Sequence, residues 1–217
     1  MKRMIVSPSV LSANFLNLGK DIEMLNQNAD MIHLDVMDGI FVPNLSYGTP
    51  IVKAIMKEAK IPVEAHMMIV EPYKFYKEYS QMGVSAISVH YEACSHLNRD
   101  ITQIKDLGMK AGVSINPHTN EILLEHILPF IDFVLIMSVN PGFGAQKYIP
   151  HSTEKIARMR ALVDRINPNC KIEVDGGISL SNIEMIAEAG ADIVVAGNSV
   201  FSAENPSEVI KKLQCCR

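Results

Sequence analysis

The feature that most constrains the fold of this chain is a regular alternation of short β-rich runs with amphipathic segments. Candidate strands lie at 3–9, 30–36, 61–69, 84–90, 110–116, 132–139, 171–177 and 191–197. Apolar residues recur with helical spacing at 17–28, 49–60, 71–82, 98–108, 119–128, 152–166, 179–190 and 205–214. Because parallel strands need long crossover connections, usually helices, this alternation predicts an α/β fold with a parallel sheet.

Eight strand and helix units in a chain of 217 residues match a closed (β/α)8 TIM barrel. We expect one such domain over residues 1–217. A doubly wound open sheet is the structural alternative. It typically carries a GxGxxG turn after its first strand, whereas "SPSVLSAN" stands there in this chain.

Charge and composition limit the partners. The formal net charge is −4 and no run of lysines and arginines occurs, so neither nucleic acid nor a membrane surface is expected as a partner. No apolar stretch approaches the roughly 20 residues of a membrane-spanning helix. The basic N-terminus precedes an apolar run too short and too soon broken for a signal peptide. The cysteines form no CxxC pair, which favours free thiols in the cytoplasm: Cys94, Cys170, Cys215 and Cys216.

The second candidate strand, within "ADMIHLDVMDGIFVPN", carries two polar residues in an apolar setting. Side chains alternate along a strand, so His33 and Asp35 share one face, while Ile32 and Leu34 share the other. Burial of a carboxylate costs free energy unless a charged or hydrogen-bonding partner lies beside it. A partner for Asp35 is therefore expected on another strand.

Two further strands carry polar side chains near their ends, with the same alternation. The third strand places Glu64 and His66 on one face, and the seventh places Lys171, Glu173 and Asp175 on one face. Catalytic groups of a (β/α)8 barrel lie at the C-terminal ends of its strands. We expect the deeper residues of these faces, Glu64, Lys171 and Glu173, to form a buried structural ion network.

Two imidazoles and two carboxylates at the mouth of a barrel suit a divalent cation, which would offset the cost of burying both carboxylates. The predicted ligands are His33, Asp35, His66 and Asp175. Hydrogen-bonded core residues are the alternative. A carboxylate on each side of a carbon next to a carbonyl could remove a proton from one face and return one to the other. Periodicity alone does not distinguish such an inversion from metal-assisted hydrolysis.

Glycines follow the last three strands, in "SVNPGFGAQKYIP", "DGGIS" and "AGNSVF". Glycines let backbone N–H groups approach an anion, and the loops after strands seven and eight are the recurrent phosphate position of this fold. Ordinary turns are the alternative for each loop alone. Met37, Met68 and Met137 stand at strand ends beside the proposed ligands, either as an apolar collar around the reacting carbon or as gap-filling core residues.

The motifs "SPSVLSANF", "IHLDVMDGIFVPN", "HMMI", "SVHYEAC", "MSVNPGFGAQKYIP", "IEVDGGI" and "AGNSVF" closely resemble, in order and spacing, those of the ribulose-phosphate 3-epimerase family. The resemblance covers essentially the whole chain. It implies a ribulose-phosphate binding barrel that interconverts D-ribulose 5-phosphate and D-xylulose 5-phosphate in the pentose phosphate pathway. It also implies one divalent metal ion per subunit, of zinc, iron, manganese or cobalt, and a homo-oligomer, either a dimer or a hexamer.

The resemblance also implies residue roles. The metal positions fall on His33, Asp35, His66 and Asp175, and the proton acceptor and donor fall on Asp35 and Asp175. The methionine collar falls on Met37, Met68 and Met137. The substrate contacts implied by the resemblance are Ser7, His66, Gly142, Phe143, Gly144, Ala145, Asp175, Gly176, Gly177, Gly197 and Asn198.

The chain departs from the family pattern at three places. The family's loop usually has the sequence GFGGQ, and Ala145 replaces its last glycine. If that residue needs a positive φ, alanine costs roughly 1 kcal/mol there. Asn198 stands for the usual serine, and "HMMI" for "HLMV". None of these changes touches a proposed ligand or base.

Two other functions remain open from the sequence. One is a sister epimerase acting on a ketohexose phosphate such as D-allulose 6-phosphate, which would share the reaction and the ligands and differ in relative kcat/KM. The other is a catalytically silent barrel that binds a sugar phosphate. That alternative is typical of chains that have lost a ligand or a base, and this chain keeps them all.

Overall fold

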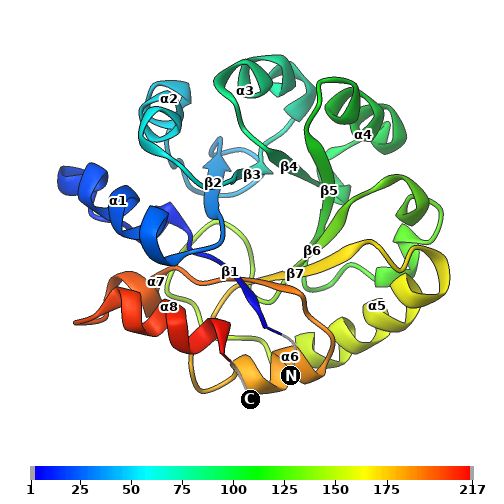
Figure 1. Cartoon of the computed structure of the whole chain (residues 1–217). Helices are drawn as coiled ribbons and strands as arrows, with labels where there is room; N and C mark the ends of the chain where they lie inside the picture. The colour runs from blue at the N-terminus through cyan, green and yellow to red at the C-terminus, as the bar shows by residue number, and fades with distance from the viewer. Residues whose placement is uncertain (1–2, 216–217) are drawn as a thin grey trace.

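The computed structural model describes residues 3–215, in which eight parallel strands form a ring surrounded by helices (Figure 1). The strands are β1 (Ile5–Ser7), β2 (Ile32–Met37), β3 (Val63–Met68), β4 (Ala86–His90), β5 (Lys110–Ile115), β6 (Phe133–Met137), β7 (Lys171–Asp175) and β8 (Ile193–Val195). Each lies within one of the predicted strand segments or extends one residue beyond it. The (β/α)8 TIM barrel predicted from the alternation is therefore confirmed.

The order of strands in the sheet is β1-β8-β7-β6-β5-β4-β3-β2, with every neighbouring pair parallel. The ring closes between β1 and β2 through a single parallel bridge that joins Ser9 to His33. At this seam the N–H of His33 donates to the carbonyl of Pro8 at 3.1 Å. The closure excludes the doubly wound open sheet.

Helices cover the outside of the ring: α1 (Leu18–Asn28), α2 (Thr49–Glu58), α3 (Tyr76–Met82), α4 (Leu97–Asp106), α5 (Ser152–Ile166), α6 (Ile183–Glu188), α7 (Asn198–Phe201) and α8 (Pro206–Gln214). Short 3-10 turns interrupt the connections: η1 (Val10–Ser12), η2 (Phe15–Asn17), η3 (Pro72–Lys74) and η4 (Tyr91–Ala93). Within residues 3–215, no helix has the length and apolar character needed to cross a membrane. Cys94, Cys170 and Cys215 are free thiols, and Cys216 lies outside the described residues.

The prediction of a helix at 119–128 is wrong. The segment instead contains the 3-10 turn η5 (Glu121–Leu124), followed by η6 (Leu128–Phe130). Asn120 caps η5 by accepting from the N–H two residues later, and Pro129 restricts the backbone of the residue before it. Because the residues buried by η5 and its continuation recur mostly every third position, the tighter helix suits them better.

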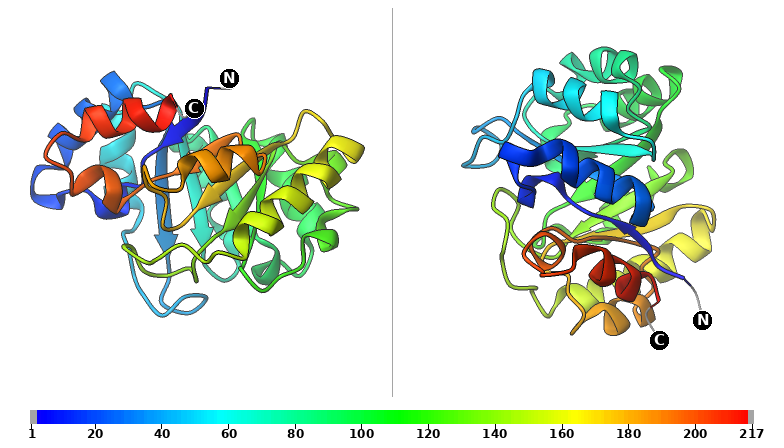
Figure 2. Two further views of the ribbon diagram at one scale, coloured as in Figure 1. Left: turned by 90° about the horizontal axis from the view of Figure 1, so that it is seen from below. Right: turned by 60° about the vertical axis from the view of Figure 1, so that its left-hand side comes forward.

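The two faces of each strand serve different layers. On β2, Ile32, Leu34 and Val36 join the large apolar core between the sheet and the helices. The alternate residues, His33 and Asp35, point into the ring. Figure 2 shows the chain ends at one end of the barrel and the long loops after β2 and β6 at the other, where the strands end. The polar residues of the strand ends therefore face the mouth that these loops surround.

Candidate active site

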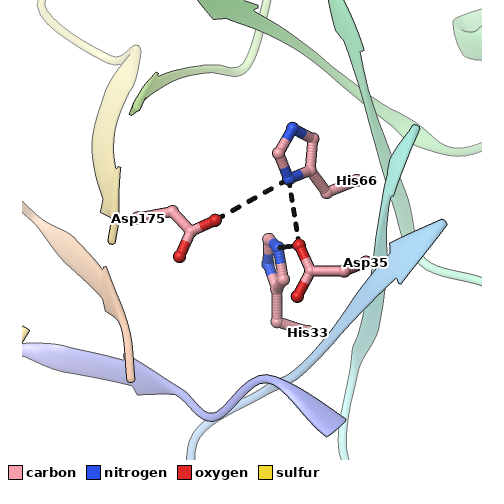
Figure 3. Close-up of side chains that lie close together, drawn as sticks. All are labelled: His33, Asp35, His66 and Asp175. Carbon is pink, nitrogen blue, oxygen red and sulfur yellow. Dashed lines mark ion pairs between the residues drawn. The ribbon is translucent and has the colours of Figure 1, made fainter. Parts of the chain in front are cut away.

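The four predicted ligand side chains converge inside the mouth of the barrel (Figure 3). His66 Nδ1, from β3, lies 3.3 Å from Asp35 Oδ1 on β2 and 3.8 Å from Asp175 Oδ2 at the end of β7. His33 Nε2 lies 3.5 Å from Asp35 Oδ1. One donor atom from each of the four residues lies within 4.8 Å of the other three. Strand alternation alone thus brings two imidazoles and two carboxylates to one point.

The donor atoms of this cluster suit a divalent cation. Both ring nitrogens of His33 and Nδ1 of His66 are buried and have no hydrogen-bond partner among residues 3–215. Buried polar atoms without partners are rare in native proteins and call for an explanation, an unseen ion being one. Two imidazole nitrogens and two carboxylates are a ligand set for zinc, iron, manganese or cobalt. The residues present therefore fit such an ion.

The two members of β2 hold each other in the charged form in the absence of a metal. Burial alone would lower the pKa of His33, but Asp35, together with Glu64 and Glu173, outweighs burial and raises the pKa to about 10. Burial alone would raise the pKa of Asp35, but His33 and His66 hold it well below its usual range. Asp35 is therefore an ionised carboxylate at neutral pH.

The pKa values of the other two residues, His66 and Asp175, are shifted so that the imidazole is neutral and the carboxyl is more easily protonated. Burial lowers the pKa of His66 to about 3, so this imidazole is neutral and can act as a ligand. Burial, together with the charge of Asp35, raises the pKa of Asp175 to about 7. Two carboxylates with pKa values pushed apart are the usual arrangement for an acid and a base in one site.

A second acidic layer lies beneath the four residues. His33 Nδ1 lies 3.8 Å from Glu173 Oε1 and 4.0 Å from Glu64 Oε1, and all three residues are fully buried. Burial raises the pKa of Glu64 and, helped by the charge of Glu64, that of Glu173 far more. The predicted network is wrong for Lys171, which begins β7 with its side chain exposed.

A cavity of about 210 Å³ opens above the cluster. Asp35, Asp175 and the three predicted methionines, Met37, Met68 and Met137, line it. The methionines are buried and pack into two small apolar clusters at the strand ends. The cavity thus has acidic groups at its base and a polarizable apolar wall.

The loops predicted to hold phosphate also line this cavity. They contribute Gly142, Phe143, Gly144, Ala145, Gly176, Gly177, Gly197 and Asn198. Gly177 has a φ of +66°, and a Cβ there would lie 2.3 Å from the backbone nitrogen of Tyr148. Only glycine fits so close to another backbone. Loops from three successive strands therefore present backbone on one side of the cavity.

Two predicted substrate contacts lie away from the cavity wall. Ser7, the last residue of β1, is fully buried, and its hydroxyl has no hydrogen-bond partner in the described chain. His66 is also fully buried, beneath Asp35 and Asp175. The serine that lines the cavity is Ser9, whose hydroxyl donates a short hydrogen bond to Asp35 Oδ2. Sequence reasoning missed Ser9 because the chain leaves the strand before reaching it.

A third imidazole contacts the site. His90, at the end of β4, is fully buried and places Nε2 2.9 Å from Nε2 of His66. Its other nitrogen lies 3.1 Å from Glu92 Oε2. The alternation used for β2 and β3 also points His90 inward, so the sequence carried a signal for it that was not used.

Comparisons with known proteins agree with this geometry. A sequence model described as the ribulose-phosphate 3 epimerase family matches residues 5–201. The ribulose-phosphate 3-epimerase of Synechocystis sp. is 47% identical over 212 residues, covering 96% of this chain and 92% of that protein. The Bacillus subtilis protein of the same name is 42% identical over 211 residues, covering 96% and 97%. The Escherichia coli protein is 38% identical over 216 residues, covering 99% and 96%.

Solved structures of other enzymes share the fold. The 3-hexulose-6-phosphate synthase from Salmonella typhimurium has a TM-score of 0.73 at 16% identity, and the comparison covers 97% of each chain. The orotidine 5'-phosphate decarboxylase from Pyrococcus horikoshii has a TM-score of 0.68 at 15% identity, again covering 97% of each. At these identities the likeness shows a common barrel and nothing of the reaction.

Proposed function

Because this chain belongs to the ribulose-phosphate 3-epimerase family, we propose that the cavity above β2, β3 and β7 is its active site. The chain is an isomerase of the pentose phosphate pathway and interconverts D-ribulose 5-phosphate and D-xylulose 5-phosphate. The two sugars differ only in configuration at C3. The enzyme therefore has to remove the C3 proton from one face and return a proton to the other.

Asp35 and Asp175 are the two groups that we propose to move this proton. The supporting observation is that both carboxylates line one cavity while their pKa values are displaced in opposite directions. An ionised carboxylate accepts the proton from one face of C3, and a protonated carboxylic acid on the other face supplies one. The reverse reaction exchanges the two roles.

His33, Asp35, His66 and Asp175 would hold a divalent metal ion, which would be zinc, iron, manganese or cobalt. When bound, the ion supplies positive charge that polarises the substrate carbonyl and stabilises the negative charge left when the C3 proton departs. Ser9 holds Asp35 by a hydrogen bond, which fixes the orientation of this carboxylate toward the cavity.

The rest of the cavity orients the sugar phosphate. The glycine-rich loops at 142–145, 176–177 and 197–198 would hold the phosphate with backbone N–H groups. Met37, Met68 and Met137 would surround C3 and exclude water, which protects the deprotonated sugar from side reactions. Ser7 and His66 lie beneath this wall, so we propose that they act on the substrate only indirectly, through the residues above them.

A solvent-exchange assay tests this function. The chelated protein and the protein reloaded with Zn²⁺ or Mn²⁺ are incubated with D-ribulose 5-phosphate in D₂O. We expect metal-dependent formation of D-xylulose 5-phosphate with deuterium at C3. A folded, reloaded protein that gives neither product nor deuterium would refute the proposal. Exchange with D-allulose 6-phosphate alone would assign the sister reaction instead.

We also propose a homo-oligomer, a dimer or a hexamer, in the cytoplasm. Large apolar side chains near the cavity mouth are exposed, with Leu16 at 94%, Ile40 at 73% and Leu45 at 72% of their surface, and exposed apolar patches often mark interfaces. Light scattering after size exclusion measures the subunit number. The free cysteines of the described chain support a reducing compartment. Cell fractionation tests the location.

A further inference from the structure

A series of three side chains leads from the active site through two buried imidazoles to a carboxylate that is 20% exposed, Glu92. His66 Nδ1 faces Asp35 and Asp175, and its Nε2 lies 2.9 Å from Nε2 of His90. His90 Nδ1 lies 3.1 Å from Glu92 Oε2. Both imidazoles are fully buried, so water cannot replace either partner.

The contact between the two imidazoles limits where their hydrogens lie. A neutral imidazole carries one hydrogen, on one of its two nitrogens. If both Nε2 atoms carried a hydrogen they would repel each other, and if neither did there would be no hydrogen bond. At 2.9 Å, His66 and His90 therefore share one hydrogen between their Nε2 atoms. Two arrangements satisfy this condition.

His66 Nδ1 lies 3.3 Å from Asp35 Oδ1 but has no hydrogen-bond partner among the described residues, so Glu92 selects one of the two arrangements. Its Oε1 accepts from the hydroxyl of Thr119 and from the N–H of Asn116 at 2.9 Å, while its Oε2 faces His90. Burial would raise the pKa of Glu92, but these bonds and the bond to His90 lower it to about 2, so the carboxylate only accepts. His90 must then carry its hydrogen on Nδ1, and its Nε2 accepts.

The loop that holds Glu92 is fixed from a third direction. Lys155, on α5, has its side chain buried and donates from Nζ to the carbonyl of Asn116 at 2.5 Å and to that of Pro117 at 3.3 Å. Asn116 and Thr119 are the residues that donate to Glu92. The orientation of Glu92 is therefore set by packed elements and not by a freely moving loop.

We propose that His90 and Glu92 are positioning residues that place the hydrogen of His66 on Nε2 and so present an unprotonated Nδ1 to the metal site. The inference rests on the proposed function, because Nδ1 is useful only if a metal binds there. Hydrogen-bond partners of metal-binding histidines fix the tautomer in this way in many metal sites. Neither residue touches the substrate cavity.

The substitution Glu92→Gln reverses the arrangement. Thr119 and Asn116 both donate to the Oε1 position, so the amide oxygen takes that place and the amide nitrogen faces His90 Nδ1. His90 then accepts at Nδ1 and donates from Nε2, which moves the hydrogen of His66 to Nδ1, where the metal should bind. We expect the Kd for Zn²⁺ to rise by about 10- to 100-fold.

Two measurements carry the test. ¹⁵N NMR of the metal-free protein at pH 7.5 reports which nitrogen of each imidazole carries the hydrogen, and chelator competition gives the Kd for Zn²⁺. We expect Nε2–H at His66 in the wild type and Nδ1–H in Glu92→Gln. Glu121→Gln is the control variant, since the Glu121 side chain is also largely shielded from solvent, at 10% exposed against 20% for Glu92, but it pairs with Arg158, and the Kd of this variant should match the wild type.

The outcomes separate this inference from the proposed function. A wild-type His66 with its hydrogen on Nδ1 overturns the inference, even if Glu92→Gln does not fold. Unchanged spectra and Kd in a folded Glu92→Gln protein overturn it as well. A wild-type protein that binds no Zn²⁺ refutes the metal site itself, whatever the spectra show. His90→Gln, whose amide oxygen can still accept from His66, should bind Zn²⁺ more tightly than His90→Leu.

Discussion

Ala145 departs from the family pattern, and we expect its replacement by glycine to stabilise the protein. This residue lines the active-site cavity with a φ of +56°, in the left-handed region that favours glycine. A Cβ in this conformation lies too close to the following carbonyl oxygen. Replacement by glycine removes that strain from the folded state.

The size of the effect follows from two opposing contributions. The left-handed conformation costs an L-residue about 1–2 kcal/mol. Glycine gives the unfolded chain more freedom than alanine, which lowers the free energy of unfolding by about 0.4–1 kcal/mol. The middles of these two ranges give a net gain for Ala145→Gly of about 0.8 kcal/mol, or about 2–3 °C in Tm for a chain of this size.

Urea unfolding of the metal-free protein measures this gain, with two control variants. Glu71→Gly relieves the other non-glycine residue of positive φ among the described residues, at +51°, and should also stabilise. Ala59→Gly acts at an ordinary φ of −67° and should destabilise by about 0.4–1 kcal/mol. If Ala145→Gly behaves like Ala59→Gly, the strain attributed to this loop does not exist.

Three further predictions concern the site and its support. Asp175→Asn should lower kcat by about 10²- to 10⁴-fold, because an amide cannot exchange a proton with C3. Urea unfolding should show no loss of stability, because the substitution removes a carboxylate that Asp35 repels, and a destabilised variant would contradict this reason. Despite its burial, metal-free His33 has its pKa raised to about 10, so Zn²⁺ has to displace a proton below that pH. The logarithm of the Zn²⁺ affinity, from chelator competition, should therefore rise by about one per pH unit between about pH 8 and 9.5, above the pKa of about 7 of Asp175, and a flat profile would show that His33 is already neutral. Lys155→Met should lower the free energy of unfolding by about 1–3 kcal/mol, since it leaves the carbonyls of Asn116 and Pro117 without their donor; an unchanged urea midpoint would mean that water replaces the ammonium.

The elements and the central cluster could be predicted from the sequence because they depend on periodicity alone. Strand alternation decides which side chains share a face, and this is enough to predict that His33, Asp35, His66 and Asp175 lie together. The order of the strands follows from the crossover connections. Neither inference needs to know how the side chains pack.

Features outside regular structure were not predictable in this way. Ser9 follows the end of β1, where alternation no longer fixes the direction of a side chain, so the neighbouring Ser7 was named instead. Lys171 obeys the alternation, but it is the first residue of β7 and its side chain reaches the surface. The segment 119–128 has apolar residues that suit an α-helix and a 3-10 turn alike, and only its neighbours decide between them.

Because the barrel closes between β1 and β2, the catalytic centre depends on the order in which the strands are synthesised. A ribosome makes β1 first and β8 last, yet β1 has its ladder partners in β8, from Ile5 with Ile193 to Ser7 with Val195. Ser9, directly after β1, bridges to His33 and holds Asp35. Until β8 has emerged, β1, which leads into Ser9, has no neighbouring strand on the side away from β2. The nascent chain therefore completes its proton-transfer site only after β8 has been made, and a chain terminated before Ile193 lacks it.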